Sequence, residues 1–193
     1  MIDVSTSTIY VVAVRSNGSL PSLELHGLGL ADGKEKFGGP VVVRATVRGQ
    51  GYDSVDGAVR LKVEGHLQLQ RTGLLLIDNA VILGLGGYQD ADPYHGWLIE
   101  YRANNLKEQI AVLNTTPDSS RGGIWQSGGA PAADPEGNLY VVTANGEADG
   151  VTDFGCSFLK LSARGLAVTD WYTPEDCHAL NEADWDLGTS GPS

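Results

Sequence analysis

Three stretches of the chain share one pattern of apolar and polar positions. Each begins with a polar turn, continues as a run of β-branched and aromatic residues, and ends in glycine or polar residues. The stretches are STIYVVAVRS (7–16), DNAVILGLGG (78–87) and EGNLYVVTANG (136–146). Runs of this composition and length, bounded by turn residues, are typical of β-strands. The sequence therefore predicts an internal repeat in which the same strand recurs.

The segments around this strand also recur in a fixed order. A second apolar run follows in each copy, then a turn signal rich in Asn, Asp or Gly, then a third run. In order, these segments are 22–30, 95–103 and 157–163 for the second run, 31–34, 103–106 and 162–165 for the turn, and 35–39, 108–114 and 166–173 for the third run. In the second and third copies a further short run, GLLLI (73–77) or APAAD (130–134), comes before the shared strand.

This order predicts an all-β fold built from up-and-down, four-stranded antiparallel units, each one blade of a β-propeller. A single sheet would expose two apolar faces, and stacking blades face to face buries them. We expect a single segment over 1–193 with about three blades and an incomplete ring. The first blade covers about 7–47 and lacks its first strand, and the others cover about 72–114 and about 129–173. A β-sandwich or barrel is the alternative.

Three blades are too few to close a propeller, which has about four to eight. The stretch LGTSGPS (187–193) resembles QSGGAPA (126–132), which leads into the first strand of the third unit. The ring is therefore expected to be completed by the remaining blades of a longer chain or by a homo-oligomer. Either arrangement would cover the end faces, which would otherwise be sticky.

The charge of the chain excludes two classes of partner. Lys and Arg total 13 against 24 Asp and Glu, which gives a net charge of −11. Because this charge repels phosphate backbones and anionic lipid, no nucleic acid and no membrane is expected as a partner. The first ten residues lack a basic start and an apolar core, so no signal peptide is predicted in this chain. Cys156 and Cys177 could form a disulfide or remain two buried thiols.

Several strings in the chain resemble a known family. LGLADGKEKFGG (28–39) resembles the repeat element of pyrroloquinoline quinone (PQQ)-like propellers, with Phe37 where tryptophan is usual. QRTGLLLIDNAVILGLGG (70–87), GGIWQSGGAPAADPEGNLYVVTANG (122–146) and the shorter PYHGWLIEY and SFLKLS are similar to bacterial PQQ-repeat proteins. The similarity runs from about Thr8 to Pro192 and implies a propeller scaffold.

The resemblance also bears on cofactor, function and location. PQQ-dependent dehydrogenases of this family close eight blades around the quinone and a metal, and several have a pair of adjacent cysteines. This chain has no adjacent cysteines and no aspartate that matches the catalytic base, so PQQ is not expected in this segment. The expected function is a binding or interaction scaffold; the alternatives are a quinoprotein-like oxidoreductase or a metal-assisted hydrolase. The resemblance suggests a periplasmic or secreted protein.

The long connections should emerge on one face of the blades, because the tight turns lie on the other, and a ligand is expected on the long-loop face. Arg71, Trp125 and Gln126 come just before innermost strands, where they would rim the axial opening. A guanidinium, an indole and an amide suit an anionic or sugar-like small molecule. The alternative is that Trp125 fills the seam between blades and Arg71 pairs with a carboxylate.

Two acidic loops on the same face are candidate metal sites. Asp90, Asp92 and His95 combine carboxylates with an imidazole, which could hold calcium or another divalent metal. Asn145, Glu147, Asp149 and Asp153 resemble a calcium loop without its closing glutamate. For both loops, ordinary solvated turn chemistry is the competing interpretation.

Overall fold

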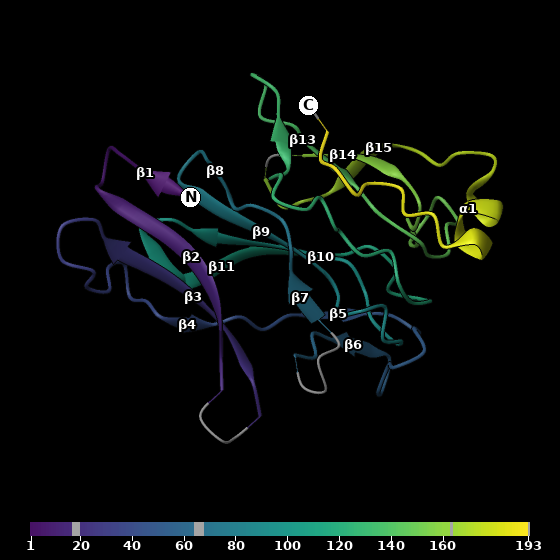
Figure 1. The fold of residues 1–193 in the computed structure, drawn as a ribbon, viewed down its shortest axis with the longest axis horizontal. Coiled ribbons are helices and arrows are strands. Elements are labelled where there is room, and N and C mark those ends of the chain that lie inside the picture. Colours follow the sequence, from purple (N-terminus) through teal and green to yellow (C-terminus); the bar gives the residue numbers. More distant parts are fainter. Residues whose placement is uncertain (17–19, 64–67, 163, 193) are drawn as a thin grey trace.

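The computed structural model describes residues 1–16, 20–63, 68–162 and 164–192, which form a row of antiparallel sheets. In Figure 1 the first sheet is purple and blue, the second is teal and the third is green. The first sheet has the order β1-β2-β3-β4, so strands that follow one another in sequence are neighbours. Its strands are β1 (Ile2–Asp3), β2 (Thr8–Arg15), β3 (Ser22–Gly29) and β4 (Val41–Val42).

The second sheet has two short strands along its inner edge. Both β7 (Gln68–Gln70) and β8 (Leu75–Ile77) pair with β9 (Ala80–Gly87), at its end and its start respectively. The sheet continues with β10 (Trp97–Arg102) and β11 (Asn105–Asn114).

The third sheet has the same up-and-down order. It contains β12 (Ala132–Ala133), β13 (Leu139–Val142), β14 (Phe158–Leu161) and β15 (Val168–Tyr172), paired in that sequence. The prediction of an all-β fold with about three up-and-down, four-stranded blades in an incomplete ring is confirmed.

The first sheet differs in two details from what the sequence suggests. The short strand β1 pairs with β2 through Ile2 and Ile9, in the inner position where no strand was expected. The outer strand is β4, whereas the expected EKFGG segment contributes only an isolated bridge between Glu35 and Leu28. Phe37 and Gly38 both have positive φ angles, so the chain turns there instead of continuing as a strand. Ala163, in the third of the expected turns, lies outside the described residues.

Two apolar cores lie between the three sheets. Tyr10, Leu23 and Leu25 of the first sheet pack with Leu83 and Ile99 of the second. On the opposite face of the second sheet, Ile82 and Leu98 pack with a set from the third sheet that includes Leu139, Val141 and Leu159. Every residue of β9 is buried, because alternate side chains enter different cores. Its nearly continuous apolar run reflects this coverage on both faces.

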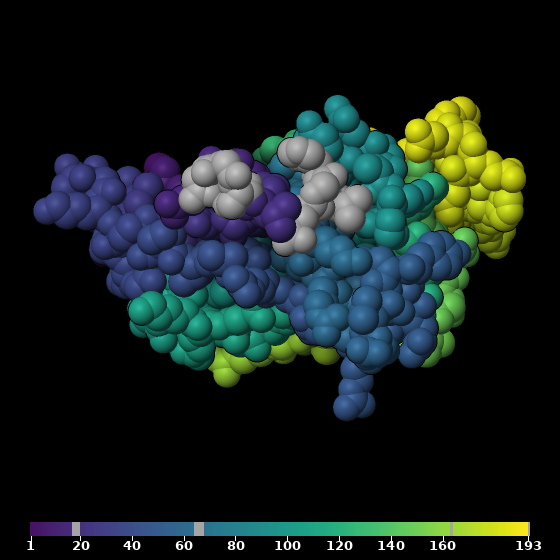
Figure 2. All heavy atoms as spheres, turned by 90° about the horizontal axis from the view of Figure 1, so that it is seen from below, coloured from purple at the N-terminus to yellow at the C-terminus, as the bar shows by residue number. Residues whose placement is uncertain are grey.

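The connections contain structure that the apolar pattern does not indicate. Between the first and second sheets, β5 (Thr46–Arg48) and β6 (Ala58–Arg60) form a separate two-stranded sheet. Figure 2 shows this connection, in blue, spread over much of the face seen from below. After the third sheet the chain forms the short helix α1 (Cys177–Ala183), which has no buried residue. Among the described residues, no helix is long and apolar enough to span a bilayer.

Candidate functional site

Four long connections meet at one end of the sheets. Arg121 forms a parallel bridge with His95 and an antiparallel bridge with Gly146, which joins three of these connections through their backbones. The connection between the first two sheets adds to them, because the Gly51 amide donates to the carbonyl oxygen of Pro117 at 2.8 Å. The predicted long-loop face is therefore a continuous layer of interlocked loops.

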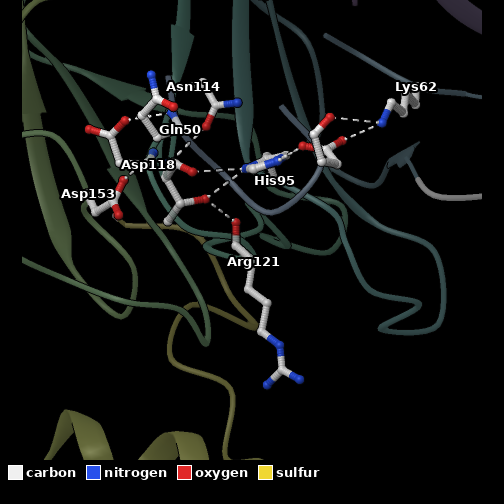
Figure 3. A network of polar contacts seen from close by, with 9 residues as sticks. Gln50, Lys62, His95, Asn114, Asp118, Arg121 and Asp153 are labelled. Carbon is white, nitrogen blue, oxygen red and sulfur yellow. Dashed lines mark hydrogen bonds and ion pairs between the residues drawn. The ribbon is translucent and has the colours of Figure 1, made fainter. Parts of the chain in front are cut away.

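His95 lies at the centre of a network of polar contacts in this layer (Figure 3). Its side chain is almost completely buried. Its Nε2 atom lies 2.9 Å from Oδ1 of Asp53, and its Nδ1 atom lies 3.0 Å from the carbonyl oxygen of Thr116. The hydroxyl of Thr116 donates to the carbonyl oxygen of Arg121 at 2.7 Å. Both ring nitrogens of His95 thus face oxygen acceptors, and both are occupied by groups of the protein itself.

Asp53 is held between His95 and Lys62, whose ammonium nitrogen lies 2.9 Å from Oδ2. Burial alone would raise the pKa of the Asp53 carboxyl, because desolvation disfavours its charged form. Hydrogen bonds from His95 and Lys62, together with their charges, outweigh this effect and hold the pKa below its ordinary value. Asp53 is therefore a charged anchor between the β5–β6 connection and the second sheet. No sequence motif marks it.

The structure does not bring Asp90 and Asp92 together with His95 as one ligand set. Asp92 pairs with Arg121, whose Nε atom lies 3.0 Å from Oδ2. Asp90 accepts a hydrogen bond from the hydroxyl of Tyr94 at 3.1 Å. Within the described ranges, no group of three or more His, Cys, Asp or Glu side chains could hold a metal ion. The carboxylates of Asp90 and Asp92 thus bind other side chains of the protein, and they do not form a ligand set with His95.

The second acidic loop is closed by hydrogen bonds from its own backbone. Oδ1 of Asp149 accepts the amides of Val151, Thr152 and Asp153 at 2.8 to 2.9 Å. These bonds, the one from Val151 above all, lower the pKa of Asp149 to about 2. The amide of Asn145 donates to Asp184 at 3.0 Å, so this side chain points to the connection after the third sheet. Asx-turn chemistry accounts for the spacing of these polar residues.

Arg71 and Trp125 are in direct contact. The guanidinium carbon of Arg71 lies 4.9 Å from the centre of the Trp125 ring, which is a cation–π arrangement. Tyr94 packs beside the same indole, with ring centres 5.8 Å apart. The indole nitrogen donates to Oδ1 of Asp186 at 3.1 Å. Trp125 is buried and Arg71 is exposed, so the guanidinium is the part of this pair that faces solvent.

Gln126 is completely buried, and neither polar atom of its side-chain amide has a hydrogen-bond partner in the described structure. Its backbone amide donates to the carbonyl oxygen of Gly188 at 3.0 Å. The segment after α1, residues 184–192, which we call the tail, therefore lies against Gln126. The structure thus places Arg71 and Trp125 together, with Gln126 beneath the tail.

Asp186 is a residue of this region that sequence reasoning missed. Burial raises the pKa of its carboxyl, the Trp125 indole partly offsets this, and the nearby Asp90 and Asp184 raise it further. The sequence contains one signal for this contact, which is the likeness of 187–193 to 126–132. Equivalent segments of successive repeats lie side by side, so the likeness indicates that the tail lies beside the segment of Trp125 and Gln126.

Comparison with known proteins supports the fold. No family model matches the chain, and no curated protein matches it. Among solved structures, it is similar to a quinohemoprotein alcohol dehydrogenase from Pseudomonas putida HK5, with a TM-score of 0.58 and 15% sequence identity. The similarity covers 86% of this chain and 25% of the dehydrogenase, so the chain spans about a quarter of that protein's length. At this identity the likeness concerns the fold alone: these sheets are arranged as in a quinoprotein-type propeller.

Proposed function

We propose that the chain is a propeller-type interaction scaffold with no catalytic site of its own. The observation that carries the proposal is the open outer face of the third sheet. Phe158 and Tyr172 are 44% and 60% exposed there, and their ring centres lie 6.4 Å apart. On the same face, Lys160 of β14 extends over the ring of Tyr140 of β13, 5.9 Å from its centre. Exposed aromatic residues gathered on one surface are typical of interaction sites.

The two faces of the third sheet differ in their surroundings. On one face, Leu139, Val141 and Leu159 are buried against the second sheet. The opposite face borders a shallow cavity of about 420 Å³. The residues of this face that line it are Tyr140, Phe158, Lys160, Asp170 and Tyr172, together with Pro192. A sheet with apolar groups on both faces is most stable when a further layer covers the second face.

The backbone contacts between units indicate what that layer is. The segment that leads into β8 of the second sheet bonds to the one that leads into β12 of the third, since the amide of Gly73 donates to the carbonyl oxygen of Gly129 at 2.9 Å. One step further along, Gln126 donates to Gly188 at 3.0 Å and Ser127 to Thr189 at 3.1 Å. Residues 188 and 189 thus bond to the segment before the third sheet much as Gly129 bonds to a segment of the second sheet. This repetition favours a further four-stranded sheet of the same kind as the partner of the open face.

A second copy of the chain can supply such a sheet. The outer side of its first sheet carries exposed Val11 and Val42, which lie on the face opposite the core residues Leu23 and Leu25. Two copies with three large sheets each would give six blades, which lies within the range of about four to eight that closed propellers contain. Head-to-tail contact of the first and third sheets is therefore the specific form of the proposal.

The polar residues of the loop layer support a scaffold over an enzyme. His95, Asp92 and Trp125 each have a partner inside the chain, and His95 is buried between Asp53 and Thr116. Residues held in this way stabilise loops. A metal-assisted hydrolase would need a different arrangement of Asp90, Asp92 and His95, so that alternative is less well supported.

The oxidoreductase alternative requires a place for a quinone. An aromatic quinone would stack on an indole, but Trp125 is only 5% exposed and has Arg71 over its ring and Tyr94 beside it. A Cβ atom on Gly86 would lie 2.7 Å from two carbons of the same indole, so this side is filled as well. Trp125 therefore offers no free face on which a quinone could stack. Adding PQQ and calcium to the purified protein should accordingly leave the absorbance of the quinone unchanged.

The scaffold proposal can be tested by light scattering over a range of protein concentrations under reducing conditions. The wild-type chain should associate as concentration rises. The double variant Phe158→Ser/Tyr172→Ser should remain a monomer, because it removes apolar area from the proposed contact.

Tyr52→Ser is the matched control, since Tyr52 is 78% exposed and belongs to the connection that contains β5 and β6. It should associate as the wild type does. A wild-type chain that is monomeric at every concentration would contradict the proposal. Equal loss of association in the control would show that the third sheet is not the contact.

A further inference from the structure

Cys156 and Cys177 lie at the junction between α1 and the third sheet. Cys156 comes two residues before β14, and Cys177 begins α1, a few residues after β15. Phe158 and Tyr172 are opposite each other in these antiparallel strands. The pairing continues one step outside the ladder, where the hydroxyls of Ser157 and Thr173 lie 2.6 Å apart. Cys156, directly before Ser157, therefore lies close to the segment that follows Thr173 and leads to Cys177.

A second set of contacts brings the helix to the same point. Asn181, one turn after Cys177, accepts the amide of Gly146 at 3.2 Å and donates to the carbonyl oxygen of Gly146 at 3.0 Å. Gly155, directly before Cys156, packs against the backbone of Gly146 so closely that a Cβ atom would not fit. Gly146 thus contacts the neighbours of both cysteines.

The two thiols interact and differ in their surroundings. Cys156 is completely buried, and burial followed by the contact with Cys177 raises its thiol pKa to about 12. Cys177 is partly exposed and lines a cavity of about 450 Å³ together with Gly146, His178 and Asn181. A small molecule that enters this cavity would reach Cys177, whereas Cys156 is buried and does not line the cavity.

The helix has few other means of attachment. None of its residues is buried, so it lacks the apolar packing that stabilises most helices in proteins. It is held by polar contacts, chiefly those of Asn181 with Gly146 and of Asp184 with Asn145. A covalent bond at Cys177 would therefore change its stability more than that of a well-packed helix.

We propose that Cys156 and Cys177 are a redox-active pair that forms a reversible disulfide with a small-molecule disulfide as oxidant, and that this bond locks α1 onto the third sheet. The thiolate of Cys177 attacks one sulfur of the oxidant and releases one thiolate. Cys156 then attacks the sulfur of Cys177 in the mixed disulfide and releases the second small thiol, which takes up the proton of Cys156. The two protein thiols are oxidised, and the small disulfide is reduced to two thiols.

The test treats the fully reduced protein with oxidised glutathione and follows intact mass and peptide maps. The wild type should lose two hydrogens in mass, yield a Cys156–Cys177 peptide and return to the starting mass with dithiothreitol. Cys156→Ala should stop at a mixed disulfide of Cys177 with glutathione. Cys177→Ala should remain unmodified under the same conditions, because its remaining thiol is buried. Thermal unfolding of the oxidised wild type should occur roughly 5 to 10 °C above that of the reduced form.

Two results would overturn the proposal. One is a wild-type protein that stops at the mixed disulfide, which would mean that Cys156 cannot reach Cys177. The other is a wild-type protein that does not react, which would mean that the cavity does not admit the oxidant. The peptide map of the wild type decides between these results even if a variant fails to fold. The test does not depend on association through the third sheet, so it is separate from the scaffold proposal.

Discussion

His95 and Asp53 are 42 positions apart in the sequence, and Nε2 of the imidazole lies 2.9 Å from Oδ1 of the carboxylate. Both side chains are shielded from solvent, with exposed fractions of 1% and 6%. The contact fastens the β5–β6 connection to the loop that follows β9. A residue that resembles a metal ligand in the sequence thus holds two distant segments together.

Asp53→Ala should lower the free energy of unfolding by about 3 kcal/mol, because it leaves a buried imidazole without its partner. Urea denaturation monitored by circular dichroism measures this change. Glu136→Ala removes a carboxylate from an exposed turn and should have little effect. An equal effect of both variants would show that the pair is unimportant for stability.

Glu100→Gln should stabilise the protein at neutral pH. Glu100 is buried in β10, and its Oε2 atom has no hydrogen-bond partner in the described structure. Desolvation raises the pKa of its carboxyl above 4.5, although a backbone contact with Gly165 and two nearby arginines oppose the shift. The folded state thus carries a charge that costs free energy, and the neutral amide removes this cost.

The pH dependence of this effect has a definite sign. In the wild type, the folded state binds the proton of Glu100 more tightly than the unfolded state does. The destabilisation of the folded state by the charged carboxylate is therefore relieved as pH falls through the raised pKa. The difference in melting temperature between Glu100→Gln and wild type should therefore be largest above that pKa. It should shrink as pH falls towards 4.5, the ordinary value. Glu136→Gln serves as the exposed control in calorimetry. A difference that grows on acidification would contradict this assignment.

Gly96→Ala should destabilise the loop layer by about 3 kcal/mol or more, because the new methyl group would overlap the carbonyl oxygen of Gly122. Gly96 follows His95 directly and accepts the amide of Thr115 at 3.0 Å, so the chain cannot move away without disturbing the His95 contacts. Gly73→Ala meets its nearest atom at 3.3 Å and should be milder. Comparing their denaturation midpoints tests whether the close approach at Gly96 matters.

Trp125→Phe should cost about 2 kcal/mol of stability, because it leaves the partly buried carboxylate of Asp186 without its indole donor. It should also raise the pKa of Asp186 further, since that donor lowers it. Trp185→Phe is the control, because Trp185 is 68% exposed. Denaturant unfolding at pH 7 and pH 5 should show a smaller loss at the lower pH, where Asp186 is more protonated in the variant. A loss that is independent of pH would point to packing alone.

The strands that carry the repeat were predictable because each has enough apolar residues to show its pattern. Ala80–Gly87 is the best example, since it is buried on both faces and its sequence is nearly all apolar. The two-residue strands Ile2–Asp3 and Val41–Val42 are too short for any periodicity. The β5–β6 hairpin consists of three-residue strands with few buried side chains, so its sequence does not differ from that of a loop.

The candidate site was less predictable because it depends on contacts between distant loops. The sequence places Arg71 and Trp125 before innermost strands, and the structure has them in contact. It does not indicate that Asp53 reaches His95, since no periodic pattern fixes the course of the connection that contains Asp53. The partner of Trp125, Asp186, likewise belongs to the tail, whose position follows from its backbone contacts with Gln126 and Ser127.

The position of the second sheet between two others has a consequence for how the molecule opens. The first and third sheets can each detach while the second keeps one neighbour, whereas β9 loses all protection only when both cores are broken. Local opening should therefore begin at the two ends of the row and reach the middle last. The amide protons of Val81 to Leu85 should exchange with deuterium more slowly than those of β2 or β15. The tolerance of the chain to insertions and cleavage should follow the same gradient.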